Sequence, residues 1–170
     1  MRAFFALVPG ESVRVALCTL GRALAEQIGG RAVPAHNIHL TLAFIGNVEP
    51  LRVSALCALL DELPRYSFVL MLDRVGEWHH AGVAWTAPSV VPRTLTALHA
   101  RLDERLRVGE FPVEARPFRP HVTLVRRRKR PLADGPSTLI DWRVERVSLM
   151  RSESIAGGVR YREEAGVGLG

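Results

Sequence analysis

A chain of 170 residues is long enough for one well-buried domain, or for two small lobes that share an interface, and too short for two ordinary independent domains. Its hydrophobic content of 48% excludes general disorder, and its apolar runs stop well short of the ~20 residues that span a bilayer, so we expect a soluble protein with no membrane contact. The net charge of +6 favours a polyanionic partner, although nearly all the basic residues are arginine, a bias that GC-rich codon usage also produces.

The first half of the chain alternates strands and helices. A strand is expected over residues 2–8 and is not a signal peptide, because no full apolar core and cleavage site follow it. A helix with apolar residues at helical spacing comes next, until a Gly-Gly pair ends it. A proline-containing approach leads into a strand over residues 38–45, and a second helix follows over residues 50–64. Cys18 and Cys57 lie in helical patterns without metal-ligand spacing, so we expect buried thiols in a reducing cytoplasm.

The middle of the chain predicts a hairpin and a third helix. Strands are expected over residues 67–75 and 83–86, joined by the turn-prone segment 76–82. The third helix begins at Pro92 and ends at Gly109.

The last third predicts two strands and an ambiguous tail. One strand is expected over residues 121–126, and another over residues 139–150 after the breaker-rich segment 131–136. The tail is rich in glycine, and only residues 159–163 are a candidate for a last strand.

Two of these strands carry the same motif, a histidine followed two residues later by a threonine. The motifs are His39-Leu40-Thr41-Leu42 and His121-Val122-Thr123-Leu124. Side chains two apart on a strand share a face, so each imidazole lies beside a hydroxyl while the apolar residues point into a core. A lone histidine on a strand is usually structural, but a repeated one indicates chemistry. The helix and the approach recur with the motif, so we expect two pseudo-repeated lobes whose motif strands meet across a central groove.

Paired imidazoles predict acid–base chemistry. With an unperturbed pKa of ~6.5, one imidazole can be neutral and accept a proton while the other is charged and donates one, which gives a bell-shaped dependence of rate on pH. Threonine hydroxyls beside them suit the oxygens of a phosphate. A zinc or iron site is the competing interpretation, but neither histidine is flanked by Asp, Glu or Cys and no HExxH occurs. We therefore expect no metal and no cofactor.

In these residues the chain resembles the 2H phosphoesterase superfamily, and specifically the bacterial RNA 2′,3′-cyclic phosphodiesterases, historically called 2′-5′ RNA ligases. The resemblance extends beyond the two motifs to residues 2–7, 33–38, 43–46 and 119–120. It implies an α+β bilobal fold, with two pseudo-symmetric antiparallel sheets around a central groove and helices packed outside. The whole of residues 1–170 would form this single domain.

The resemblance also implies roles for the motif residues. His39 would be the general acid that protonates the departing ribose oxygen, and His121 the general base that activates water. Thr41 and Thr123 would bind phosphate oxygens.

The family has an aromatic residue five positions after the first histidine and an arginine five after the second. Here these are Phe44, which would stack on a base, and Arg126, which would pair with phosphate. Strict alternation puts both off the face of the motif, and their equal offset suggests that each strand ends or bulges there. A core position for Phe44 and a solvated charge for Arg126 remain alternatives. The chain departs from the family pattern over residues 163–170, where an apolar strand is usual.

The resemblance thus implies a monomeric, metal-independent hydrolase of the cytoplasm. It would open the 2′,3′-cyclic phosphate of an RNA end or of a small cyclic nucleotide to a 2′-phosphomonoester, with weak reverse 2′-5′ ligation. A non-catalytic RNA-binding module that keeps the groove is the alternative. The basic run over residues 126–130 would contact RNA, or else is a solvated loop. The other histidines match no family motif and are interpreted as surface or structural; they are His36, His79, His80 and His99.

Overall fold

The computed structural model describes residues 1–133 and 139–170. The main elements in chain order are β1 (Arg2–Leu7), α1 (Glu11–Ile28), β2 (Arg31–Ala32), β3 (Leu40–Asn47), α2 (Val53–Leu59), β4 (Phe68–Leu72), β5 (Arg74–Trp78), β6 (Val83–Ala87), α3 (Arg93–Val108), β7 (Val122–Arg126), β8 (Ile140–Val144), β9 (Arg146–Ile155) and β10 (Gly158–Gly168). Short 3-10 turns lie at Ala35–Asn37 and on both sides of α2, at Pro50–Arg52 and Leu60–Glu62.

The strands form two antiparallel sheets. The larger has the order β10-β9-β1-β3-β7-β6-β5, with β2 added beside β7, and the smaller consists of β4 and β8. The larger sheet divides into two groups of four strands, because β3 and β7 are joined through the single residue pair Leu40 and Val122. The expected α+β fold with antiparallel sheets is confirmed.

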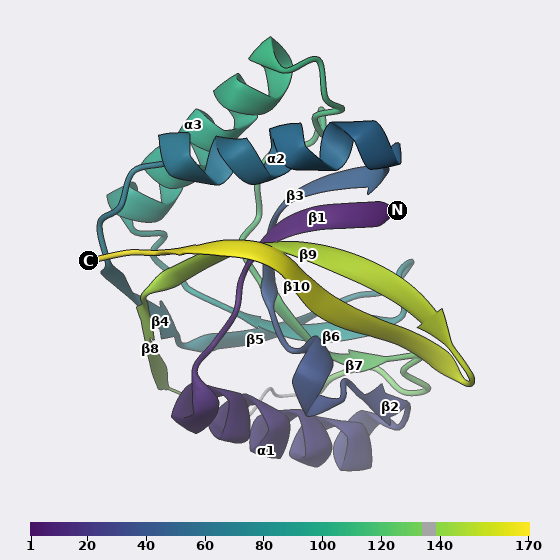
Figure 1. Ribbon diagram of the computed structural model, residues 1–170. Coiled ribbons are helices and arrows are strands. Elements are labelled where there is room, and N and C mark those ends of the chain that lie inside the picture. The colour runs from purple at the N-terminus through teal and green to yellow at the C-terminus, as the bar shows by residue number, and fades with distance from the viewer. Residues whose placement is uncertain (134–138) are drawn as a thin grey trace.

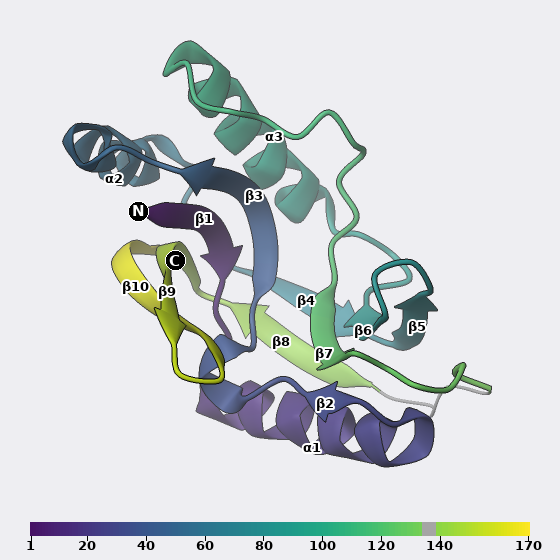
Figure 2. The same cartoon turned by 90° about the vertical axis from the view of Figure 1, so that its right-hand side faces the viewer.

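The helices cover one face of the larger sheet and leave the other for function. In Figures 1 and 2, α1 lies at one end of the molecule and α2 and α3 lie at the other. Alternate residues of β1 show the division between the faces. Ala3, Phe5 and Leu7 belong to the main core under the helices, whereas Phe4 and Ala6 belong to a small apolar cluster on the opposite face.

The first and third helices begin and end where the sequence predicts, whereas the helix expected over residues 50–64 is α-helical only over Val53–Leu59, between two 3-10 turns. α1 follows Gly10 and ends before Gly29 and Gly30, both of which have positive φ. A Cβ on Gly30 would lie 2.7 Å from the carbonyl oxygen of Arg126, so this glycine lets the end of α1 approach β7 closely. Cys18 and Cys57 are half-buried rather than buried as expected. No helix in the described parts of the chain is long and apolar enough to cross a membrane.

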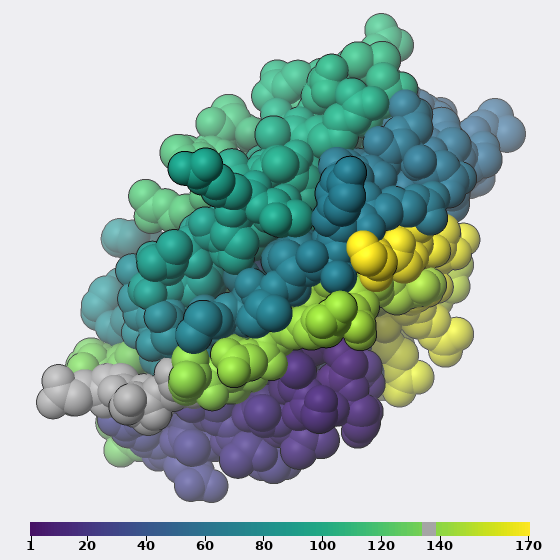
Figure 3. Space-filling model, turned by 90° about the vertical axis from the view of Figure 1, so that its left-hand side faces the viewer, coloured from purple at the N-terminus to yellow at the C-terminus, as the bar shows by residue number. Residues whose placement is uncertain are grey.

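The single strand expected over residues 139–150 is in fact two strands. The chain leaves the small sheet at Glu145, so that β8 pairs with β4 while β9 pairs with β1 and β10. The burial pattern changes phase there, since Trp142 and Val144 are buried before the break and Val147 and Leu149 after it. Figure 3 shows β8 as a yellow-green band between α1 and the teal part of the chain. The preceding breaker-rich segment lies partly outside the described residues, which omit 134–138.

The expected hairpin is displaced by several residues. Residues 67–75 do not form one strand, because β4 pairs with β8 and β5 pairs with β6. Gly76 and Trp78, expected in the turn, lie in β5. The glycine is required inside this strand, because a Cβ there would lie 2.4 Å from the indole ring of Trp85 on β6.

The tail forms a longer strand than expected. β10 extends over eleven residues and pairs with β9 throughout, with one irregularity at Glu164. The glycines of β10 interrupt the alternation of side chains by which a strand is predicted. Gly166 has a structural reason, because the guanidinium of Arg146 lies across it and leaves no room for a Cβ. Val167 and Leu169 are buried and supply the apolar anchor of this end of the chain.

Candidate active site

The two motifs meet at the junction between the halves of the larger sheet. Leu40 on β3 pairs with Val122 on β7, and both are buried. Extending this antiparallel register by one residue in each direction sets His39 opposite Thr123, and places His121 opposite the threonine of the first motif. All four polar side chains therefore share the sheet face that the helices leave open.

The cavities on this face agree with the crossed arrangement. A cavity of about 500 Å³ is lined by His39, Thr123 and Arg126, among others. A second, of about 520 Å³, is lined by Thr41 and His121. Each histidine thus shares a cavity with the threonine of the other motif.

Both imidazoles are held in the same orientation and tautomer. Nδ1 of His39 lies 2.7 Å from the carbonyl oxygen of Asn37, and Nδ1 of His121 lies 2.7 Å from that of Arg119. A carbonyl oxygen only accepts, so in each neutral ring the proton is on Nδ1 and the lone pair is on Nε2. Nε2 of His39 accepts from the hydroxyl of Thr41 at 3.0 Å. Each ring therefore presents Nε2 for proton transfer.

A bulge in β3 explains the position of Phe44. The pairing with β1 includes Thr41 and Ala43 but skips Leu42. Because one residue is left out of the ladder, Phe44 returns to the face of Thr41. Its ring is 37% exposed and lies under the guanidinium of Arg2, 5.0 Å away. The alternative of a core position for Phe44 is therefore wrong, but Phe44 lines neither of the two cavities that hold the histidines.

The same bulge recurs in β7 and brings Arg126 to the site. Pairing with β6 includes Thr123 and Val125 but skips Leu124, the residue that corresponds to the one skipped in β3. Arg126 therefore shares the face of Thr123 and lines the cavity of His39. Its charge acts on both imidazoles, and no carboxylate within residues 1–133 or 139–170 forms an ion pair with it. The sequence suggested an ended or bulged strand at both places, and the bulges are present.

The environment keeps both imidazoles neutral. Burial, together with the positive charge of Arg126 and the proximity of the titratable His121, lowers the pKa of His39 to about 4 despite the opposing hydrogen bond to the carbonyl of Asn37. Burial and Arg126 also lower the pKa of His121, again against a carbonyl hydrogen bond. An anion bound between the rings would offset the charge of Arg126 and raise both pKa values.

Three residues around His39 have no assigned role in the sequence interpretation. The Asn37 amide donates to the carbonyl of Val159 at 2.7 Å and accepts from the backbone N–H of Tyr161 at 3.0 Å, which fastens β10 to the approach of β3. The rings of Tyr161 and Phe4 lie 5.1 and 4.9 Å from the imidazole of His39. Asn37 and Phe4 belong to the family-like segments, whereas Tyr161 lies in the tail whose glycines concealed the strand.

One tryptophan packs against His121, and a second tryptophan packs against the first. Trp78 meets the imidazole edge-to-face, with ring centres 4.4 Å apart, and Trp85 lies 5.5 Å beyond Trp78. Sequence reasoning missed Trp78 because it assigned residues 76–82 to a turn. The alternation of Trp78 with Gly76 along β5 was the only sequence pattern that could have indicated its position.

The basic run is divided by the structure. Arg127 lines the cavity of His39, whereas the Arg128 side chain is 9% exposed and its Nε lies 3.3 Å from a carboxylate oxygen of Glu77. Glu77 also accepts from the backbone N–H of Leu132 at 2.8 Å. Arg130 donates to the carbonyl of residue 26. Arg128 is thus part of the loop's own structure rather than a free charge.

The remaining histidines are distributed over the surface. His79 contacts Glu77 and Arg128, His80 is exposed, and His99 stacks on Phe118 with ring centres 3.9 Å apart. His36 lines the cavity of His39. Among residues 1–133 and 139–170 no three His, Cys, Asp or Glu side chains gather in an arrangement suited to a metal ion.

Comparison with known sequences gives one family and two relatives. A family model described as the 2′-5′ RNA ligase superfamily matches residues 13–155. A protein of Escherichia coli K12 named RNA 2′,3′-cyclic phosphodiesterase is 41% identical over 98 residues, which cover 57% of this chain and only 55% of that protein. A protein of Thermus thermophilus with the same name is 33% identical over 174 residues, covering 95% of this chain and 86% of that protein.

Solved structures share the whole fold. The crystal structure of E. coli LigT complexed with 3′-AMP is 30% identical, with a TM-score of 0.88 over 99% of this chain and 97% of the other. TT0787 of T. thermophilus is 28% identical, with a TM-score of 0.83 over 99% and 98%. The MHV ns2 PDE domain, 14% identical with a TM-score of 0.64 over 96% and 99%, shares the fold alone.

Proposed function

Because the chain belongs to the 2′-5′ RNA ligase superfamily, we propose that it hydrolyses the 2′,3′-cyclic phosphate of RNA ends or small nucleotides to a 2′-phosphomonoester. The two relatives named RNA 2′,3′-cyclic phosphodiesterase support this activity. The observation that carries the proposal is the pair of imidazoles on one sheet face, each with Nδ1 held by a carbonyl and Nε2 presented to a cavity.

The pair provides the two proton transfers of an in-line displacement. Nε2 of His121 takes a proton from water as the water oxygen attacks phosphorus. Nε2 of His39 gives its proton to the ribose O3′ as the bond from O3′ to phosphorus breaks. Attacking and leaving oxygens lie on opposite sides of phosphorus, which requires one proton-transfer group on each side. The pairing of the two motif strands supports this assignment, because it brings one histidine from each strand to the same sheet face.

The threonine hydroxyls of the two motifs and Arg126 bind the anionic oxygens of the cyclic phosphate. Thr41 and Thr123 lie beside the opposite histidines and donate to the non-bridging oxygens, which requires Thr41 to release Nε2 of His39. Arg126 pairs with the same phosphate. Phe44, farther along β3, stacks on a base of a longer RNA.

The low pKa of His39 is compatible with its role as the acid. The negative phosphate takes the place of solvent next to Arg126 and favours the charged imidazole. Substrate binding therefore raises the pKa of His39 and promotes its protonation. No metal ion takes part in these steps. We further propose a cytoplasmic monomer with weak reverse 2′-5′ ligation.

A non-catalytic RNA-binding module is the alternative, and turnover distinguishes the two. Purified protein in EDTA is incubated with cytidine 2′,3′-cyclic phosphate between pH 4 and 8, and the product is identified by phosphorus NMR. We expect the 2′-phosphate, with a bell-shaped kcat/KM whose maximum lies below pH 6.5, because the pKa values of both free imidazoles are lowered. Absence of phosphomonoester, with oligonucleotide binding retained, would favour the binding module.

A further inference from the structure

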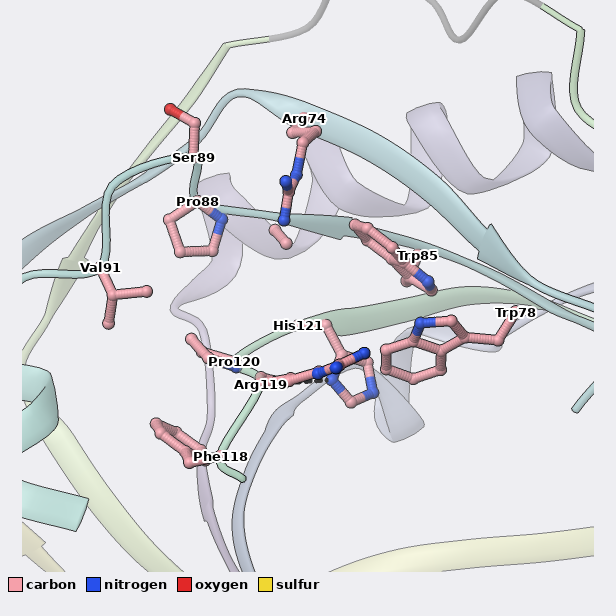
Figure 4. A pocket seen from close by; sticks show the side chains of 11 residues that line it. Arg74, Trp78, Trp85, Pro88, Ser89, Val91, Phe118, Arg119, Pro120 and His121 are labelled. Carbon is pink, nitrogen blue, oxygen red and sulfur yellow. Dashed lines mark hydrogen bonds between the residues drawn. The ribbon is translucent and has the colours of Figure 1, made fainter. Parts of the chain in front are cut away.

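A third cavity, of about 310 Å³, opens beside His121 and has a composition of its own (Figure 4). We call it the tryptophan pocket; its lining is Arg74, Trp78, Trp85, Ala87, Pro88, Ser89, Val91, Phe118, Arg119, Pro120 and His121. It includes the histidine of the second motif and no residue of the first. It is within the usual size range of cavities that take a small ligand.

The sheet builds the floor of the pocket on the face of the catalytic groups. Trp85 pairs with Thr123 on one side and with Gly76 on the other, so its indole ring shares the face of the motif threonine. The ring lies over Gly76, where a Cβ would come within 2.4 Å of its atoms. Trp78, two residues along β5, extends the aromatic surface to the imidazole of His121. Such a surface is suited to stacking with a nucleobase.

The charged side chains of the pocket favour phosphate. In Figure 4, Arg74 enters from the side of Trp85, and Arg119 crosses the opposite side next to His121. The guanidinium carbon of Arg74 lies 5.5 Å from the Trp85 ring centre. Among residues 1–133 and 139–170 no carboxylate lines the pocket, whereas the larger cavity beside His121 includes Asp103 and Glu114. Of the two cavities, the tryptophan pocket is therefore the better match to a nucleotide.

The position of the pocket identifies which nucleotide it takes. In the proposed function His121 removes the proton from the attacking group, while the ribose O3′ of the cyclic phosphate departs from phosphorus on the side of His39. Water occupies only the point of attack, so a pocket on this side is unused during hydrolysis. We propose that the tryptophan pocket binds the nucleoside of a second RNA end that carries a free 5′-hydroxyl.

The reaction then follows the hydrolytic steps with a different nucleophile. The 5′-hydroxyl gives its proton to Nε2 of His121, and its oxygen forms a bond to phosphorus. The bond from phosphorus to O3′ breaks, and O3′ takes the proton of His39. The product is a 2′-5′ linkage, and no nucleotide cofactor is consumed because the cyclic ester supplies the leaving group. The indoles hold the acceptor base, and Arg74 and Arg119 hold the phosphate on its 3′ side. This assignment depends on the proposed function.

The test measures how the donor divides between two acceptors. Cytidine 2′,3′-cyclic phosphate is mixed with excess adenosine 3′-monophosphate, which has a free 5′-hydroxyl, and ligated and hydrolysed products are separated by chromatography. Arg74→Gln is expected to lower the ratio of ligated to hydrolysed product about tenfold, the size of one charge-assisted contact. Trp85→Leu should lower the same ratio through lost stacking. Arg22→Gln, an exposed arginine on α1, removes the same charge far from the pocket and should leave the ratio unchanged.

Binding gives a second readout that does not depend on turnover. Adenosine 3′-monophosphate should quench the fluorescence of the pocket indoles in a saturable way, while Trp142 is buried in the core and does not respond. Arg74→Gln retains all three tryptophans and should weaken this quenching about tenfold.

Two results would overturn the assignment while leaving the hydrolase intact. One is hydrolysis by the wild-type protein without any ligated product. The other is an unchanged product ratio in both Arg74→Gln and Trp85→Leu, including the case in which hydrolysis and ligation fall together, which would place the donor nucleoside in the pocket. Absence of hydrolysis by the wild-type protein would instead contradict the proposed function.

Discussion

Burial of His39 has a consequence for stability that is independent of any substrate. An unfolded chain binds a proton at this imidazole below pH 6.5, whereas the folded chain does so only near pH 4. The folded state therefore loses stability as the pH falls from 6.5 to 4, and loses nothing more at this residue below that range. A shift of this size corresponds to about 3 kcal/mol.

Replacing the imidazole should remove this loss. The free energy of unfolding, measured by urea denaturation between pH 7.5 and 4.5, should fall less in His39→Gln than in the wild-type protein, by about 2–3 kcal/mol over the range. His80→Gln, at an exposed position, should follow the wild-type curve. Parallel curves for the wild-type protein and His39→Gln would show that His39 is not held neutral in the folded state.

The residues around this imidazole mark the limit of prediction from the sequence at this scale. Alternation along a strand sufficed to place His39 beside Thr41, because both lie in one short segment. The contact with Tyr161 depends on a strand more than a hundred residues later, and on the Asn37 amide that fastens it. No local pattern contains that pairing.

At the scale of the strand, the bulges decide which side chains reach the site. Strict alternation would place Phe44 and Arg126 on the buried face, and the equal offset from each histidine was the only sign of an exception. Leu42 and Leu124, the residues skipped in the pairing, remain buried because the side chain of each unpaired residue still points into the core. A regular period of two cannot reveal a bulge, since the extra residue is visible only in the pairing with a neighbouring strand.

The crossing of Trp85 over β5 yields a prediction at the same scale. Gly76→Ala places a methyl group 2.4 Å from atoms of the indole ring, which has to move away from Trp78 or shift the strand. We expect a loss of about 1–3 kcal/mol in the free energy of unfolding, as overpacking usually costs. Urea denaturation measures this loss.

Gly168→Ala is the matched control for this substitution. It adds the same methyl group to another strand glycine, which has nothing within 4 Å and no positive φ, and it should change stability by much less. Equal effects of the two substitutions would mean that close contact with Trp85 is not what requires glycine at position 76.

At the scale of the whole molecule, the two motifs lie on either side of one junction. Each half contributes four strands, a motif strand with the same bulge, and a carbonyl that holds its histidine. These likenesses support our proposal that residues 1–170 are a single domain of two pseudo-repeated lobes. In the sequence, the recurrence of helix, approach and motif already favoured two pseudo-repeated lobes. The sheet change at Glu145 was not predicted, because apolar residues recur on both sides of it and no glycine or proline separates the two strands.

In the loop after the second motif, Arg127 should contribute to RNA binding and Arg128 to stability. Arg127 lines the cavity of His39, so Arg127→Gln should lower the slope of log K against log salt for a single-stranded oligonucleotide by ~0.7, the value of one phosphate contact. Arg128→Gln breaks the buried pair with Glu77 and should lower the urea midpoint instead. Arg22→Gln, distant on α1, should change neither quantity. An unchanged slope in Arg127→Gln would show that RNA follows another path.

Leaving-group dependence tests the central claim, that His39 is the acid and His121 the base of one site, most directly. Each histidine is replaced by alanine, and turnover is compared between a ribose 2′,3′-cyclic phosphate and a nucleotide diester with 4-nitrophenolate as leaving group. We predict that each variant loses ~10²–10⁴-fold on the cyclic phosphate, and that the double variant loses far less than the product of the two. The 4-nitrophenyl ester needs no proton on departure, so it should restore turnover to His39→Ala and not to His121→Ala. Rescue of His121→Ala alone would reverse the two roles, and full activity in either variant on the cyclic phosphate would contradict the two-histidine mechanism.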